Sequence, residues 1–104
     1  MKLKKETKSL NKKTRKDIVL FIEEYYSDED HSILLADGFE DAFVGVVESM
    51  GINPKACYSY DKCIEILSNE MNHEEAVEYF EFNVAGSYVG EYTPAFLKED
   101  EFFK

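Results

Sequence analysis

The chain has no tryptophan, only two cysteines and two prolines, and no long apolar segment. No apolar run approaches the ~18 residues of a membrane-spanning helix, so we expect no membrane association. The first residues are basic but have no apolar segment behind them, which argues against a secretory signal peptide and favours a cytoplasmic location. Two cysteines in such a context predict free thiols in a reducing compartment rather than a disulfide framework.

Motifs that carry catalysis or bind cofactors are also missing. The five glycines stand apart from one another, so no glycine-rich phosphate-binding loop is present. Cys57 and Cys63 have five residues between them, a spacing that fits neither zinc knuckles nor redox motifs, and we expect both to be small core residues. A calcium loop starting at Asp28 would need Gly and Glu where Ile33 and Phe39 stand. We therefore expect no metal, no cofactor and no enzymatic activity.

One acidic cluster leaves a chemical alternative open. Asp37, Glu40 and Asp41 surround a predicted turn, and three carboxylates at such spacing could hold a cation or act in acid–base catalysis. Catalysis would require one carboxyl group with a raised pKa, for which the sequence gives no sign. Acidic turn residues that precede a strand are the ordinary interpretation of this pattern.

Cations are scarce beyond residue 16. Residues 1–16 hold eight Lys and Arg against one Glu, a net charge of +7, whereas residues 17–104 hold four Lys against 21 acids, a net charge of −17. A body with this charge repels nucleic acid and attracts basic surfaces. We predict a basic flexible arm over residues 1–13, followed by a single acidic domain over residues 14–104.

The domain begins with a predicted helix. Thr14 and Asp17 have the spacing of an N-terminal capping pair, and the segment that follows, up to about residue 26, is rich in apolar side chains. Ile18, Phe21, Ile22 and Tyr25 recur at helical spacing, which predicts one buried stripe.

Short β-type segments follow at residues 33–35, 42–47 and 55–60. The last two are expected to pair as a hairpin over about residues 42–60, and Gly45 inside the first of them predicts a bulge. A further extended segment is expected over residues 92–97, because Thr93 precedes a proline.

Two more helices are predicted between the hairpin and this last segment. Ser59 is a suitable N-cap for a helix over residues 60–68, and Asn72 with Glu75 has the offset of a capping box. Apolar side chains from Ala76 to Tyr88 share one face of the second helix. The order of elements predicts an α+β fold, in which a small antiparallel sheet packs with an N-terminal helix and two further helices.

Aromatic side chains among acids are the clearest functional signal. Phe80 is expected in the core, whereas Phe82 points to the opposite side of its helix and Tyr79 lies between them, so the latter two are candidates for a binding face. Alternatively, a second layer such as the first helix or another subunit covers them. The complete set of interaction candidates is Asp37, Glu40, Asp41, Glu74, Glu78, Tyr79, Glu81, Phe82, Glu91 and Tyr92.

Two stretches carry a resemblance. They are residues 37–46 (DGFEDAFVGV) and residues 58–94, which include YFEFN at 79–83 and GEYTP at 90–94. Together, over about residues 34–97, they resemble a group of small, functionally uncharacterised proteins encoded by bacteriophages and prophages. The resemblance implies a protein that acts in the cytoplasm of a bacterial host, and it transfers no catalytic residue.

The sequence therefore predicts a small acidic protein-interaction module. Its expected partner is a host protein with a basic surface. In a more specific form of this hypothesis, the module inhibits a nucleic-acid-binding or defence protein by occupying its groove as a mimic of DNA. One alternative is a regulatory module that binds nucleic acid through residues 2–16; apart from these residues we expect no nucleic-acid binding. Another alternative is a structural homo-oligomer without catalytic activity.

Overall fold

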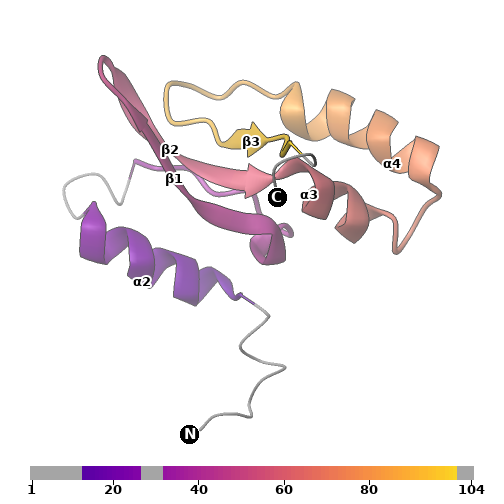
Figure 1. Cartoon of the computed structure of the whole chain (residues 1–104), viewed down its shortest axis with the longest axis horizontal. Coiled ribbons are helices and arrows are strands. Elements are labelled where there is room, and N and C mark those ends of the chain that lie inside the picture. Colours follow the sequence, from indigo (N-terminus) through magenta and orange to yellow (C-terminus); the bar gives the residue numbers. More distant parts are fainter. Residues whose placement is uncertain (1–12, 27–31, 101–104) are drawn as a thin grey trace, which may run out of the picture.

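The computed structural model describes residues 13–26 and 32–100, which form an α+β fold as the sequence predicts. In chain order the elements are helix α2 (Arg15–Tyr25), the 3₁₀ turn η1 (Glu40–Ala42), strands β1 (Phe43–Ser49) and β2 (Ile52–Ser59), helices α3 (Tyr60–Leu67) and α4 (His73–Phe80), the π-helical turn η2 (Glu81–Ala85) and strand β3 (Ala95–Leu97) (Figure 1). The predictions for residues 1–12 of the basic arm and for the acidic run at 27–31 lie outside the described residues.

Each helix starts at the residue that its local sequence indicates. The Thr14 hydroxyl accepts a hydrogen bond from the backbone N–H of Asp17, and the Asp17 carboxylate accepts one from the backbone N–H of Thr14. Asn72 and Glu75 make the same reciprocal pair at the start of α4. The Ser59 hydroxyl caps α3. These hydrogen bonds confirm the three predicted caps. The caps can be predicted from the sequence because each needs only two residues three positions apart. In the part of the chain described here, no helix has the length and apolar character needed to cross a membrane.

The three strands form a mixed sheet in the order β1-β2-β3. The predicted hairpin is present, and β1 pairs antiparallel with β2. The predicted bulge is also present, since the register shifts between Phe43 and Gly45 and Gly45 has a φ of +148°. Strand β3 pairs parallel with β2, because the chain crosses from one to the other through α3 and α4. The sequence predicts an antiparallel sheet. This prediction is wrong for β3, which pairs parallel with β2.

The segment at residues 33–35 is not a strand, contrary to the prediction. Ile33 is buried, but the backbone hydrogen bonds of this segment go to a loop and to a side chain instead of to a neighbouring strand. The N–H of Leu34 donates to the carbonyl of Tyr92 over 3.4 Å, and the N–H of Ala36 donates to the Tyr58 hydroxyl over 2.9 Å. Ile33 is therefore apolar because it is buried and not because the segment pairs as a strand, whereas Leu34 is exposed.

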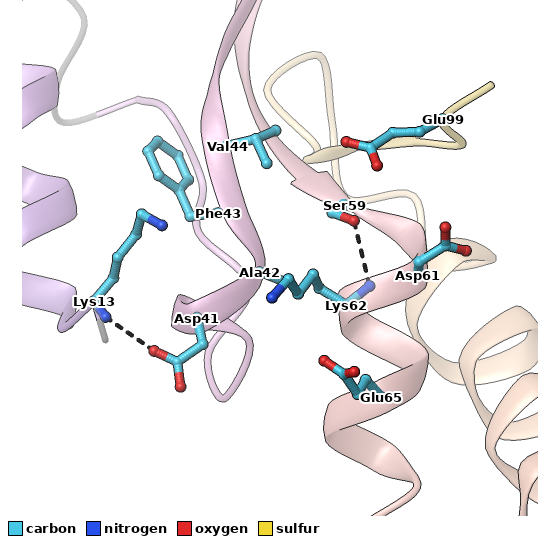
Figure 2. Close-up of a pocket in the computed structure, with 10 residues that line it drawn as sticks. All are labelled: Lys13, Asp41, Ala42, Phe43, Val44, Ser59, Asp61, Lys62, Glu65 and Glu99. Carbon is cyan, nitrogen blue, oxygen red and sulfur yellow. Dashed lines mark hydrogen bonds between the residues drawn. The ribbon is translucent and has the colours of Figure 1, made fainter. Parts of the chain in front are cut away.

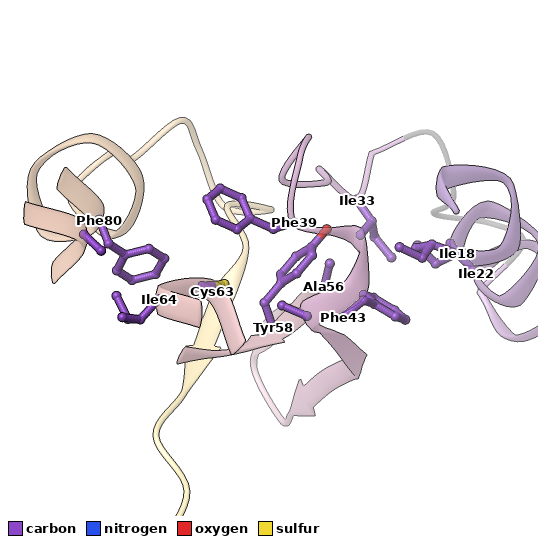
Figure 3. Close-up of a cluster of buried hydrophobic side chains, with 12 residues drawn as sticks. Ile18, Ile22, Ile33, Phe39, Phe43, Ala56, Tyr58, Cys63, Ile64 and Phe80 are labelled. Atoms are coloured by element: carbon purple, nitrogen blue, oxygen red, sulfur yellow. The ribbon is translucent and has the colours of Figure 1, made fainter. Parts of the chain in front are cut away.

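The core extends from α4 to α2 through Tyr58 on the central strand (Figure 3). The Tyr58 ring lies 5.6 Å from Phe43 and 6.0 Å from Phe96, between centroids, and the ring of Phe80 on α4 lies 4.9 Å from Phe96. Phe80 is completely buried, as predicted. The contact between Phe80 and Phe96 holds α4 against one face of the sheet.

Helix α2 closes the other end of this core. Ile18 and Ile22 are buried, whereas Phe21 and Tyr25 of the predicted stripe are exposed. The part of α2 that is buried against the core is therefore narrower than the four-residue stripe that the sequence predicts.

Two predictions about smaller features have different outcomes. Cys57 and Cys63 are buried, as expected of small interior residues. Tyr88, which was expected to continue the buried face of the last helix, is exposed. The reason is that the helical structure ends with η2 at Ala85. A π turn also changes the angular spacing of side chains, so the 3.6-residue period stops at Phe80.

Candidate protein-interaction surface

Helix α4 carries a row of carboxylates on its outer side. Ala76 and Phe80 are fully buried and fix the orientation of the helix. Glu74 and Glu78 lie one turn apart, and Glu81 follows after a further three residues, so all three fall within one narrow arc of exposed surface. Like charges at this spacing destabilise an isolated helix by about 0.2–0.5 kcal/mol per pair. Glu74 in the first turn complements the helix dipole and Glu81 interacts with the Tyr60 hydroxyl, so the stability of the fold accounts for these two carboxylates but not for Glu78.

No cation in the neighbouring sequence compensates for this row. Residues 63–97 contain seven Glu and neither Lys nor Arg. The last turn of α4 likewise has no basic residue to complement the helix dipole. The outer side of α4 is consequently a concentrated negative surface.

Two exposed aromatic side chains stand beside the carboxylates. Tyr79 is 46% exposed and Phe82 is 76% exposed, as their positions on the predicted helix indicated. Phe82 lies in η2, and π turns of this kind often occur at functional sites. Exposed aromatic rings supply a large contact area at low entropic cost, which is typical of binding surfaces.

Two adjoining hollows flank these rings, and Tyr79 and Asn83 line both of them. One hollow, of about 470 Å³, lies between α4, the end of α3 and the turn at residues 36–39, with Ile66 and Leu67 in its wall. The other, of about 430 Å³, lies between the α3–α4 connection and η2. Both have acidic rims. We name the whole region the α4 surface and define it as Glu70, Met71, Glu74, Glu75, Glu78, Tyr79, Glu81, Phe82 and Asn83.

Sequence reasoning missed part of this surface. Glu70, Met71, Glu75 and Asn83 line the hollows but were not among the candidates. The absence of cations over residues 63–97 would have drawn attention to Glu70 and Glu75. Nothing in the sequence marks Asn83, because its position depends on the π turn.

The acidic cluster at the predicted turn has partners within the chain. Arg15 at the start of α2 donates to the Asp37 carboxylate over 2.5 Å. The Asp41 carboxylate accepts a hydrogen bond from the backbone N–H of Lys13 over 2.9 Å, and the Glu40 carboxylate accepts one from the N–H of Gly38 over 3.3 Å. Asp37 reaches the rim of the first hollow on the α4 surface, whereas Glu40 and Asp41 do not line it.

Glu91 and Tyr92 lie elsewhere, beside the hairpin and the segment at 33–35. The Glu91 carboxylate accepts from the Asn53 amide over 2.7 Å, and its backbone carbonyl accepts from the Lys55 ammonium over 2.5 Å. Tyr92 is partly buried, and its carbonyl accepts from Leu34. Both residues have contacts that hold the fold together, and neither lines the hollows of the α4 surface.

A third hollow, of about 640 Å³, lies between β1 and the start of α3 and contains charges of both signs (Figure 2). Lys13 and Lys62 face a set of four carboxylates there, so the hollow favours neither an anion nor a cation. Ser59 is its only hydroxyl residue, and that oxygen already caps α3 by accepting from Lys62. Its composition therefore suggests no nucleophilic site.

The cysteines also lack the properties of nucleophiles. Burial raises the pKa of the Cys63 thiol to about 12, and burial raises the pKa of Cys57 as well. Reactive cysteines need the opposite shift, because the thiolate is the nucleophile. Within residues 13–26 and 32–100, no three His, Cys, Asp or Glu side chains gather so that they could hold a metal ion.

The α4 surface is thus the strongest candidate site, since it combines a row of glutamates, exposed aromatic rings and adjoining hollows. Comparison with known proteins adds nothing to this description: no family model, no curated protein and no solved structure matches the chain.

Proposed function

We propose that the protein is a non-catalytic interaction module whose α4 surface binds a partner protein with basic and apolar side chains. One observation carries the proposal: Phe82 and Tyr79 are exposed beside a row of glutamates, in a segment that has no Lys or Arg. Charge would steer the encounter, and the aromatic rings would supply the contact area that holds the complex.

The shape of the surface supports a protein as the partner. The hollows beside Tyr79 have apolar walls and acidic rims, which suit the aliphatic stem and charged end of a Lys or Arg side chain. Nucleic acid would be repelled by the carboxylates. A small neutral ligand would leave the glutamate row without a partner.

A more specific form of the proposal is that the partner is a protein that itself binds nucleic acid. Glu74, Glu78 and Glu81 place three negative charges along about 10 Å of helix. This short row has the charge of a phosphate backbone and would fit a groove that is lined with cations. That the partner belongs to a bacterial host, and that binding takes place in its cytoplasm, follows from the resemblance to phage proteins alone.

The alternative function, binding of nucleic acid through residues 2–16, has less support from the described residues. Arg15, at the end of the predicted nucleic-acid-binding segment, pairs with Asp37, and the backbone of Lys13 is held by Asp41. Residues 2–12 lie outside the description. No contact among residues 13–26 favours binding of a phosphate backbone.

The test is affinity capture from a bacterial lysate, followed by a binding isotherm with the captured protein. Glu74→Gln/Glu78→Gln should weaken binding about tenfold at low salt, and Phe82→Ala should weaken it about thirtyfold. The matched controls are Glu23→Gln/Glu24→Gln and Tyr25→Ala, which make the same changes on exposed positions of α2. Equal effects of the α4 and α2 variants, or affinity that does not fall with salt, would exclude the α4 surface as the site.

A further inference from the structure

One of the two hollows of the α4 surface has a base that belongs to the core. It is the hollow of about 470 Å³ that α4 forms with the end of α3 and the turn that contains Phe39. Phe39 is 7% exposed, and its ring packs edge-on to Phe80 with 6.3 Å between centroids (Figure 3). Ile66, Leu67 and Val84 are half-buried around it. We name this the Phe39 hollow, and its apolar walls are fixed by the fold.

The charged groups that line the Phe39 hollow are carboxylates, which accept hydrogen bonds and donate none when ionised. They belong to Asp37 and Glu70, and both residues are exposed. Tyr79 adds an aromatic ring with a hydroxyl, and Asn83 adds an amide. No cationic side chain from the described part of the chain lines the hollow. A ligand that fits must therefore carry a positive charge at its end and be apolar along its length.

Asp37 already binds a guanidinium group at the rim of this hollow. Arg15 of α2 donates from Nη1 to Oδ1 of Asp37 over 2.5 Å, and both residues also line a neighbouring hollow beside α2. The Asp37 side chain nevertheless stays 81% exposed, so most of its carboxylate remains accessible. Exposed ion pairs contribute little to stability, and a second cation can therefore share Asp37 or replace Arg15 at small cost. The chain itself thus shows the interaction that a cationic ligand would make here.

We propose that the Phe39 hollow binds the side chain of an arginine from the partner protein. The proposal rests on the function proposed above and deepens it, because it names the residue that the partner inserts. The methylene stem would lie against the apolar walls, and the guanidinium group would reach Asp37 and Glu70. These two carboxylates come from separate segments of the chain, so a group with donors on several sides is needed to bind both.

Arginine suits this hollow better than lysine does. The guanidinium group is planar and has five donors, so it can bind carboxylates from two segments and also stack on an aromatic ring. Tyr79 supplies that ring, since it is 46% exposed and lines the hollow. The ammonium group of lysine is a compact, strongly hydrated charge that has no planar face to stack. The charge and the shape of the hollow therefore select the same occupant.

The second hollow of the α4 surface is a weaker candidate for this role. Glu75 and Glu78 line it together with exposed aromatic rings, but none of its lining residues is buried. A side chain placed there would stay largely in water. The Phe39 hollow is thus the place where one side chain of the partner can be desolvated, and Phe82 with the glutamates forms the contact around it.

Titration of the isotopically labelled full chain with Nα-acetyl-L-arginine amide, followed through backbone amide chemical shifts, tests the proposal without the partner. We expect saturable shifts at Gly38 and Leu67, with a dissociation constant on the order of 1 mM. The corresponding lysine amide should bind about threefold more weakly, and the neutral citrulline amide should not bind. Asp37→Asn and Glu70→Gln should each weaken binding of the arginine amide about threefold. Glu65→Gln is the matched control, because Glu65 is an exposed glutamate of α3 that does not line this hollow.

Arg15→Gln separates binding at Asp37 from a purely structural role of this residue. The substitution removes the ion pair with α2 but keeps the carboxylate, so the arginine amide should bind as tightly as to the wild type or more tightly. If Arg15→Gln weakens binding as much as Asp37→Asn does, Asp37 acts only by holding α2 and the proposal is overturned.

Two further results would also overturn it. One is a lysine amide that binds as tightly as the arginine amide, which would show a site for any cation. The other is the absence of shifts at the Phe39 hollow at roughly ten times the expected dissociation constant. If that absence is found while Phe82→Ala still weakens binding of the captured protein, the arginine site is wrong and the proposed function stands. Binding of the arginine amide without capture of any protein would instead count against the proposed function and support the hollow as an arginine site.

Discussion

The hydroxyl of Tyr58, on the central strand, accepts a hydrogen bond from the backbone N–H of Ala36 over 2.9 Å. This bond ties the irregular segment that follows residue 32 to the middle of the sheet. Tyr58 is fully buried, and its ring also contacts Phe43 and Phe96, so one side chain holds both the core and the segment in place. The segment in turn carries Asp37 to the rim of the α4 surface.

Tyr58→Phe should lower the free energy of unfolding by about 1–3 kcal/mol, because the partly buried N–H of Ala36 loses its acceptor while the ring remains. Urea denaturation measures the effect. Tyr25→Phe, at an exposed position of α2, is the control and should change stability little. A similar loss in both variants would show that the bond to Ala36 contributes nothing.

Phe80 and Phe82 should have opposite roles although they are two residues apart. Phe80 is completely buried, so Phe80→Ala should lower the free energy of unfolding by about 3–5 kcal/mol. Phe82 is exposed, so Phe82→Ala should change stability by less than about 0.5 kcal/mol while it weakens partner binding. Thermal unfolding and the binding isotherm separate the two effects. A large loss of stability for Phe82→Ala would mean that its ring packs within the fold.

The bulge in β1 should depend on glycine. The φ of +148° at Gly45 is rarely adopted by other residues, and no atom lies within 4 Å of where a Cβ would stand. Gly45→Ala should therefore destabilise the protein by about 1–3 kcal/mol through backbone strain alone. Ser49→Ala, at an exposed position of the same strand, serves as the control in chemical denaturation. Unchanged stability of Gly45→Ala would show that β1 can take another register.

Local signals in the sequence predicted the helices well and the sheet only in part. The caps at Thr14, Ser59 and Asn72 each require a partner three residues away, so they can be recognised without knowledge of the fold. The segment at 33–35 resembles a strand in composition, but its hydrogen bonds depend on Tyr58 and Tyr92, which are far along the chain. The parallel pairing of β3 likewise depends on how α3 and α4 cross the sheet.

The candidate site was predictable where it follows helical periodicity. Tyr79 lies outside the core because Phe80 is inside it, and the spacing of Glu74 and Glu78 follows from the same period. The hollows were not predictable, because α4 forms them together with the end of α3 and the turn at 36–39. The pairing of Asp37 with Arg15 joins residues 22 positions apart and also depends on the fold.

Alkaline pH should destabilise the protein through Cys63. Burial raises the pKa of this thiol from 9.0 to about 12, so between these values the unfolded chain loses a proton that the folded chain keeps. The free energy of unfolding is therefore unaffected by this thiol below pH 9. It falls as the pH rises towards 12, by about 1.4 kcal/mol per pH unit for one proton. Burial raises the pKa of Tyr58 as well, which adds to the same trend above pH 10. Urea midpoints at pH 7, 9, 9.5 and 10 should fall for the wild type and fall less steeply for Cys63→Ala. Parallel declines in the two proteins would assign the alkaline loss to other groups.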